Sequence, residues 1–214
     1  SSSSNPPQPP SPPASPSSSS SAGPPVELGR HDGPVQCLIL VVRGQQAALV
    51  SGSSDKTARV WAVPAWLLSG GAAPRAPPRP PGTPPAPLSV LSGHADTVRG
   101  LALLPRHAAG DPVRLATASH DASVRVWALA DAALGFGDGG GVPAPPPSAP
   151  AAPRTLAELL GHTALVYAAA ASPAGLLASA SEDETVRVWD PDAPGAALAV
   201  LPHPGCCWTV GWVS

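Results

Sequence analysis

Three sets of side chains with the composition of a Ser-His-Asp catalytic triad recur along the sequence. Each set holds a His, a Ser or Thr, an Asp and a Trp: His31, Ser51, Asp55 and Trp61, then His94, Thr117, Asp121 and Trp127, then His162, Ser179, Asp183 and Trp189. A His that bonds both a hydroxyl and a carboxylate can activate the hydroxyl as a nucleophile. An enzyme needs one such set. Three sets favour a structural role, so we assign no catalytic residue and expect no enzyme.

The spacing within the three sets is regular. Each Asp lies six residues before its Trp, in SSDKTARVW, SHDASVRVW and SEDETVRVW, and each Ser or Thr lies four residues before the Asp. A Gly precedes the second and third His, whereas Arg30 precedes the first. Successive Asp residues are 66 and 62 positions apart, and subtracting a Pro-rich tract of about 18 residues from each interval leaves a period of about 45.

Short apolar or alternating segments between these residues predict four strands in each repeat. Innermost strands are expected at 35–42 and 98–104, second strands at 48–51, 114–117 and 176–179, Trp-bearing strands at 57–61, 123–127 and 185–189, and outer strands at 89–91 and 155–160. The segment 201–214 should open a further repeat, with Cys206 and Cys207 on a strand.

This arrangement resembles the WD-repeat blade of a β-propeller. The resemblance implies an all-β fold, a partial WD40-repeat β-propeller with about three blades and pieces of two more, expected to be an internal part of a longer protein. In WD-repeat proteins the Asp bonds the His, the His bonds the hydroxyl, and the hydroxyl bonds the Trp N–H. The twelve residues named above are therefore expected to be structural tetrads.

Proline separates the repeats from the rest of the chain. Of the 32 Pro residues, 9 lie in residues 1–25 together with 11 Ser, so this segment is expected to be disordered. The propeller is expected to span 26–214, with Pro-rich insert loops at about 70–87 and 136–153. PxxP-like spacings in these tracts could bind SH3-type domains, but a solvated loop is the simpler interpretation.

Charge and hydropathy argue against several classes of partner. The net charge is −2, with 12 basic and 14 acidic residues and no basic cluster, which argues against nucleic-acid binding. The absence of a long apolar run or a signal peptide predicts no membrane association and a cytoplasmic and nuclear location. The spacing of six His and three Cys predicts no metal site, no cofactor and no disulfide framework.

One face of the blades is the expected docking surface. The loop with each His and the turn with each Asp should open on the same face, away from the Pro-rich tracts. The candidates on this face either follow an inner-strand Val or precede a turn Asp; they are Gln36, Arg99, Tyr167, Ser54, His120 and Glu182. Tyr and Arg are common interface anchors, although a solvated rim is an equal alternative for any one of these residues.

Residues 26–214 also resemble the propeller of the phospholipase A2-activating protein family. The resemblance rests on GSSDKTARVW, SGHADTVRGLAL, HDASVRVW, GHTALVYA and SEDETVRVW, and on LPHPGCCW, where Pro204 and Trp208 break the G-H rule. It adds Trp208 to the docking candidates. It implies a non-enzymatic adaptor that binds ubiquitin in ubiquitin-dependent degradation, and that engages an AAA-family unfoldase through domains outside this chain. The alternative is a WD-repeat scaffold or substrate receptor of another assembly, such as a ubiquitin ligase, trafficking or RNP complex.

Overall fold

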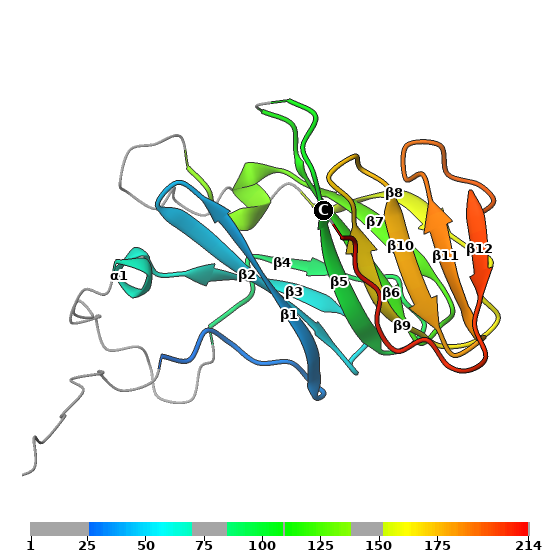
Figure 1. Ribbon diagram of the computed structural model, residues 1–214. Helices are drawn as coiled ribbons and strands as arrows, with labels where there is room; N and C mark the ends of the chain where they lie inside the picture. Colours follow the sequence, from blue (N-terminus) through cyan, green and yellow to red (C-terminus); the bar gives the residue numbers. More distant parts are fainter. Residues whose placement is uncertain (1–25, 70–84, 109, 138–151, 214) are drawn as a thin grey trace, which may run out of the picture.

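The computed structural model describes residues 26–69, 85–108, 110–137 and 152–213, and its strands form three four-stranded antiparallel sheets (Figure 1). Blade A contains β1 (Val35–Arg43), β2 (Gln46–Ser53), β3 (Ala58–Val63) and β4 (Ser89–Leu91). Blade B contains β5 (Val98–Leu104), β6 (Val113–Ser119), β7 (Val124–Leu129) and β8 (Arg154–Leu159). Blade C contains β9 (Val166–Ala171), β10 (Leu177–Ser181), β11 (Thr185–Trp189) and β12 (Ala199–Pro202). Strands pair in chain order within each blade, as the all-β prediction requires.

Two short helical turns accompany the strands: α1 (Ala65–Leu68) follows β3, and η1 (Asp131–Leu134) follows β7. None of the helices in the described part of the chain has the length and apolarity to cross a bilayer. Segment 1–25 and most of both predicted inserts lie outside the described residues.

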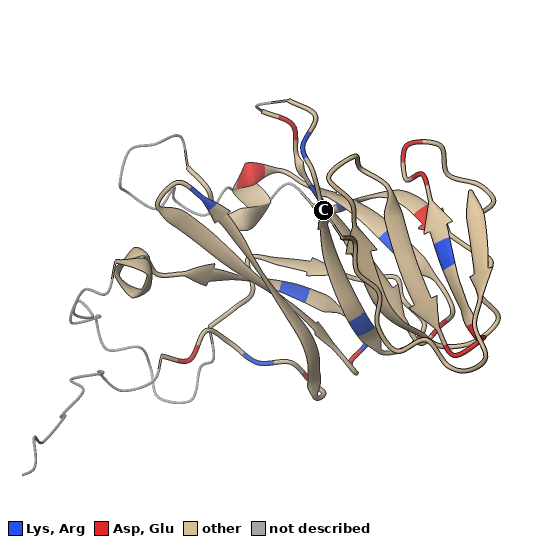
Figure 2. Ribbon diagram, viewed as in Figure 1, with Lys and Arg blue, Asp and Glu red and all other residues tan. Residues whose placement is uncertain are grey.

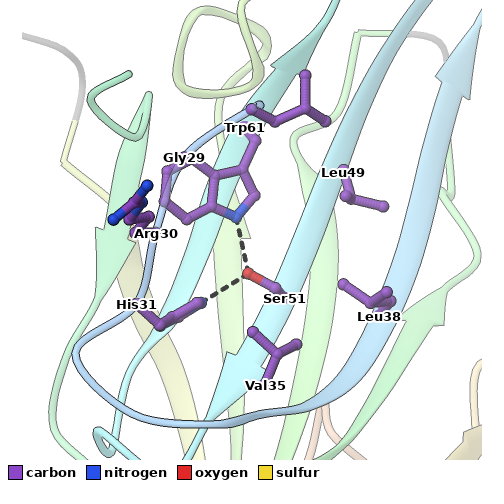
Figure 3. Close-up of a pocket in the computed structure, with 9 residues that line it drawn as sticks. Gly29, Arg30, His31, Val35, Leu38, Leu49, Ser51 and Trp61 are labelled. Atoms are coloured by element: carbon purple, nitrogen blue, oxygen red, sulfur yellow. Dashed lines mark hydrogen bonds between the residues drawn. The ribbon is translucent and has the colours of Figure 1, made fainter. Parts of the chain in front are cut away.

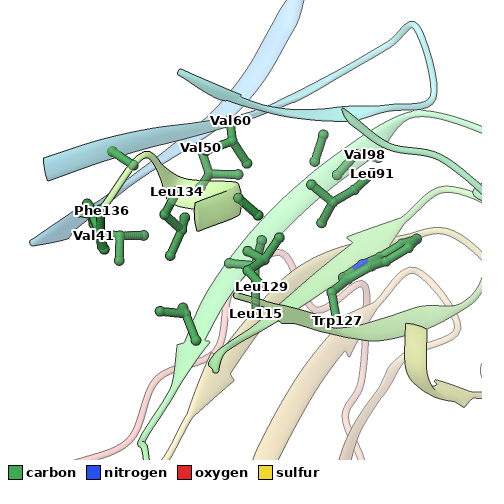
Figure 4. Packing of buried hydrophobic residues seen from close by; sticks show 14 residues of the cluster. Val41, Val50, Val60, Leu91, Val98, Leu115, Trp127, Leu129, Leu134 and Phe136 are labelled. Atoms are coloured by element: carbon green, nitrogen blue, oxygen red, sulfur yellow. The ribbon is translucent and has the colours of Figure 1, made fainter. Parts of the chain in front are cut away.

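The blades stack face to face, so the second strand of the middle blade, B, is packed on both sides. All seven residues of β6 are buried, and this strand consists mainly of small and aliphatic side chains. Between blades A and B, the indole of Trp127 and the side chains of Leu115 and Leu129 meet Val50 and Val60 (Figure 4). A second buried cluster joins blade B to blade C. Burial of these aliphatic faces, at about 25 cal/mol per Å², is the main stabilising term.

Phe136 corrects the predicted edge of the second insert. The sequence places it at the start of a Pro-rich loop, yet its ring is 6% exposed and belongs to the cluster between blades A and B. Gly135, with φ of 71°, ends η1 and turns the chain so that the Phe136 amide donates to the carbonyl of Asp131. The packed part of the chain therefore extends through Phe136.

The outer face of blade A has no sheet against it among the described residues. Val35, Leu38, Leu40 and Val42 on β1 are between 46% and 60% exposed, whereas Val98, the counterpart of Val35 in blade B, is fully buried. At the other end, residues 203–213 contain no strand, so the expectation that Cys206 and Cys207 lie on one is wrong. This segment crosses blade C and donates the Cys207 amide to the carbonyl of Ser181.

The turn between the second and third strands imposes a left-handed conformation in every blade. The residue after each turn Asp has positive φ: Lys56 at 70°, Ala122 at 65° and Glu184 at 64°. For residues other than Gly, this left-handed conformation costs about 1–2 kcal/mol. The Asp that precedes each of them holds the turn closed, as the next subsection describes.

Replacing Ala122 with Gly should relieve this strain. We expect Ala122→Gly to raise the free energy of unfolding by about 0.5–1 kcal/mol, because the relief exceeds the added freedom of the unfolded chain. Urea denaturation followed by circular dichroism measures it. Ala174, in an exposed turn without positive φ, is the matched control: Ala174→Gly should destabilise slightly. Equal effects at both positions would show that the turn is not strained.

Candidate functional site

All twelve tetrad residues lie where the repeat predicts, and each set forms one hydrogen-bonded chain. In blade A, His31 Nδ1 lies 2.7 Å from Asp55 Oδ2, His31 Nε2 lies 2.7 Å from Ser51 Oγ, and Trp61 Nε1 donates to Ser51 Oγ at 2.7 Å (Figure 3). Blades B and C repeat these contacts within 2.7–2.9 Å. Each chain joins the second strand, the third strand, the turn between them and the loop that carries the His.

Each tetrad Asp is ionised and fully occupied. Asp121 accepts the Ala95 amide at 2.8 Å, the Ser123 amide at 3.0 Å and the Ser123 hydroxyl at 2.6 Å, besides its contact with His94. Burial alone would raise the pKa of Asp121, but the bonds from Ser123, Ala95 and His94 lower it to about 2. The pKa of Asp55 is likewise about 2, and that of Asp183 is also lowered. The carboxylates therefore act as acceptors only.

The ionised Asp fixes the protonation of the His. Since the carboxylate only accepts, His Nδ1 carries the proton and donates it, and His Nε2 then accepts the hydroxyl proton. Burial lowers the pKa of His94 and of His162, against the raising effect of their Asp partners. Both rings are therefore neutral near pH 7, and the hydroxyl keeps a lone pair for the Trp N–H.

The tetrads have triad-like distances but cannot present a nucleophile. Ser51 is 2% exposed, and Thr117 and Ser179 are fully buried. Each hydroxyl already bonds both His and Trp, and the indole covers it. An open hollow of about 300 Å³ on the outer face of blade A is lined by His31, Ser51 and Trp61 of the first tetrad (Figure 3), and the Ser51 hydroxyl there is already bonded to the other two. Among the described residues, no three His, Cys, Asp or Glu side chains gather as a metal site would require.

A glycine shifted by one position accounts for Arg30. Gly93 and Gly161, directly before their His, have φ of 144° and 153°, and a Cβ on either would press on the Arg and Trp of its blade. Gly29 has φ of 152° and packs its Cα on the Trp61 ring in the same way, two residues before His31. Arg30 is thus one extra residue after the glycine, and it does not replace the glycine.

A second repeated residue escaped the sequence interpretation, although RVW stands in all three repeats. In blades A and B, the arginine of this motif pairs with acidic side chains. Arg59 Nη2 lies 2.5 Å from Asp32 and 3.2 Å from Asp55, and Arg125 Nη2 lies 2.6 Å from Glu158. The regular R-V-W alternation could have revealed this position.

The docking candidates meet at the end of the blades that carries the turn Asp residues. We call Gln36, Ser54, Arg99, His120, Tyr167, Glu182 and Trp208 the compact-face strip. Gln36, Arg99 and Tyr167 are each the extra residue of a β-bulge at the start of an innermost strand. A bulge redirects its side chain away from the regular alternation, which explains how three residues on three blades reach one surface.

One half of the strip is a polar relay from blade A to blade B. The Gln36 amide donates to Ser54 Oγ at 3.0 Å, and Arg99 Nη1 donates to Gln36 Oε1 at 3.0 Å. Arg99 is exposed and makes no ion pair with a carboxylate of the described residues. The relay therefore holds a guanidinium in place without neutralising it.

The other half of the strip is aromatic. The His120 ring meets Tyr167 edge-on at a centroid distance of 5.5 Å, and Tyr167 stacks on Trp208 at 4.4 Å and 26°. Burial and the negative charge of Glu182 raise the pKa of Tyr167, so its hydroxyl stays protonated. Trp208 remains 64% exposed. The structure thus brings all seven candidates to one end of the blades. Hydrogen bonds link Ser54, Gln36 and Arg99, and ring contacts and charge link His120, Tyr167, Trp208 and Glu182.

The opposite end of the blades holds ion pairs at the seams. Asp131 of blade B pairs with Arg43 of blade A and with Arg106, and Asp192 of blade C pairs with Arg114 of blade B. Two of these ion pairs cross the seams between neighbouring blades.

The hydroxyl at the centre of a tetrad can be removed without changing its shape. Thr117→Val leaves the His94 and Trp127 nitrogens buried without partners, so we expect a loss of about 2–4 kcal/mol in the free energy of unfolding, measured by urea denaturation. Thr117→Ser should retain most of the stability, since blades A and C use Ser here. The exposed Thr163→Val is the control; a loss as small as that of the control would contradict the tetrad's role.

The pKa shifts predict that acid weakens the fold in two ranges. The pKa values of His94 and His162 are lowered from 6.5, so the unfolded chain binds protons that the folded chain refuses, and stability should fall as the pH drops below about 6.5. The contribution of Asp121 should disappear as the pH falls from 3.8 to about 2. Urea midpoints across this range test both. A flat profile between about pH 7 and 5 would oppose the neutral-His assignment.

Comparison with known proteins agrees with this geometry. The chain matches the family model described as WD domain, G-beta repeat, over residues 24–62, 85–128 and 153–190. Coronin-7 from Rattus norvegicus and coronin-7 from Mus musculus are each 32% identical to this chain over 104 residues, which is 48% of this chain and 10% of the relative. A probable cytosolic iron-sulfur protein assembly protein 1 from Chaetomium globosum is 34% identical over 142 residues, 58% of this chain and 28% of the relative.

The chain thus spans a tenth to about a quarter of the length of these curated relatives. None of the three is named as a phospholipase A2-activating protein, so the comparisons support the repeat and leave the finer resemblance a prediction. The matched segments cover more than half of the chain and contain all three tetrads. The chain belongs to the WD40 repeat family.

Proposed function

We propose that this protein is an interaction scaffold without chemistry of its own, and that its partner docks on the compact-face strip. The observation that carries the proposal is the convergence of bulged residues from all three blades at one surface. Arg, Tyr and Trp are the residue types most enriched where interfaces gain their energy.

The fold supplies the rigidity that such a surface needs. Ser54, His120 and Glu182 each directly precede a turn Asp, whose carboxylate holds the turn through several hydrogen bonds. The remaining candidates on blades A to C stand on innermost strands that are paired along their length. A surface ordered before binding loses less conformational entropy on association.

The identity of the partner is a finer proposal. Ubiquitin is the first candidate, supported by the segment LPHPGCCW, whose Trp208 lies in the strip. An assembly of the kind named in the Chaetomium globosum relative, for cytosolic iron-sulfur proteins, is the second, supported by 34% identity over 142 residues. Either partner would use the same surface.

Changing two strip residues should weaken docking without unfolding the protein. Arg99→Ala/Trp208→Ala should weaken binding at least about tenfold, because both side chains are exposed anchors. Titration of ¹⁵N-labelled ubiquitin with the full chain tests the first candidate by NMR shifts. Affinity capture with the same variants tests any other partner.

The matched control places the same two changes at the opposite end of the blades. Arg154→Ala/Trp66→Ala removes an Arg and a Trp near the insert side and should leave binding unchanged. If both double variants lose the same partners to the same extent, the strip is not the docking site. A set of partners that survives Arg99→Ala/Trp208→Ala would refute the proposal.

A further inference from the structure

We propose that the compact-face strip recognises a peptide segment in which an Asp or Glu side chain stands close to an aromatic or large aliphatic residue. This inference rests on the proposed function and specifies the chemistry of the partner. Its two requirements come from the two halves of the strip, which the structure describes independently.

The first requirement comes from Arg99. Its guanidinium is exposed, held at 3.0 Å by Gln36 Oε1, and free of any carboxylate among the described residues. By contrast, Arg59 of blade A pairs with two carboxylates and Arg125 of blade B pairs with one. The relay from Ser54 through Gln36 fixes this side chain before a ligand arrives. A guanidinium fork matches a carboxylate in geometry and charge, so an acidic side chain is the complementary group.

The second requirement comes from Trp208. Its ring is supported on one side by Tyr167 at 4.4 Å, which is itself braced by His120 at 5.5 Å, and it remains 64% exposed. A braced aromatic surface of this kind gains most from an apolar or aromatic side chain placed against it. A partner residue of that type beside the acid would engage both halves together.

Neighbouring charges distinguish a carboxylate from a phosphate. Asp96 and Glu182 are exposed at the same end of the blades, where Figure 2 shows acidic residues near the turns, whereas Asp32 is paired with Arg59. A phosphate brings about two negative charges beside these carboxylates, so it meets more repulsion there than a single carboxylate does. Glu182, next to Tyr167, also repels an acid from the aromatic half and so sets the direction of the peptide.

The test is selection of a random phage-displayed peptide library on the full chain, with counter-selection on Arg99→Gln/Trp208→Ser. We expect enrichment of peptides that pair Asp or Glu with an aromatic or large aliphatic residue. In a synthetic enriched peptide, Asp→Asn should weaken binding at least about tenfold to the wild type and little to Arg99→Gln, which shows that the acid meets Arg99.

The outcomes separate this inference from the proposed function. Peptides that need the strip but carry no acid, or that are basic, would overturn the inference and leave the docking surface standing. Tighter binding when phosphoserine replaces the Asp would overturn the choice of a carboxylate. If no enriched peptide depends on the strip for binding, both this inference and the proposed function are overturned. Circular dichroism melting of Arg99→Gln/Trp208→Ser, expected to match the wild type, confirms that lost binding is not lost folding.

Discussion

A single hydroxyl at the centre of each blade determines most of the structure around it. It donates to the His of the preceding loop and accepts the Trp N–H of the third strand, while standing on the second strand. Without it, two buried nitrogens lose their partners at once. Through the His it reaches the turn Asp, and the turn Asp orders the residue that faces the partner. A buried hydrogen-bond chain thus sets the geometry of an exposed surface.

The repeat made the tetrads, the three blades and every strip member except Trp208 predictable, because each depends on spacing that recurs. Side-chain type and a rigid six-residue interval suffice to place Asp121 against His94. The bulges at Gln36, Arg99 and Tyr167 were not predictable, since an unpaired residue is visible only in the strand register. Composition misled at Phe136, whose Pro-rich surroundings concealed an aromatic ring that fills the core.

Two further differences between the prediction and the structure have the same origin. A sequence pattern does not show which neighbour a residue pairs with or packs against. Cys206 and Cys207 lie in a segment with apolar character, but a strand requires a neighbour for its backbone bonds, and residues 203–213 donate only isolated ones to blade C. Gly29 packs against Trp61 as the corresponding glycines of the other blades do, although one extra residue separates it from His31. Positions that are constant in type across the blades are structural, whereas Gln36, Arg99 and Tyr167 share geometry and differ in type. We expect partner recognition at positions that have the same backbone geometry in every blade but a different side chain in each.

Blade B differs from its neighbours in being covered on both faces. In a row of units that contact only adjacent units, the inner one has two stabilising interfaces and each outer one has a single interface. Backbone amides of β6 should consequently exchange with solvent only on global unfolding, while those of β1 and β12 open in smaller local events. The residue best placed to remain rigid while the outer blades fluctuate is Arg99, at the start of β5 in the middle of the row.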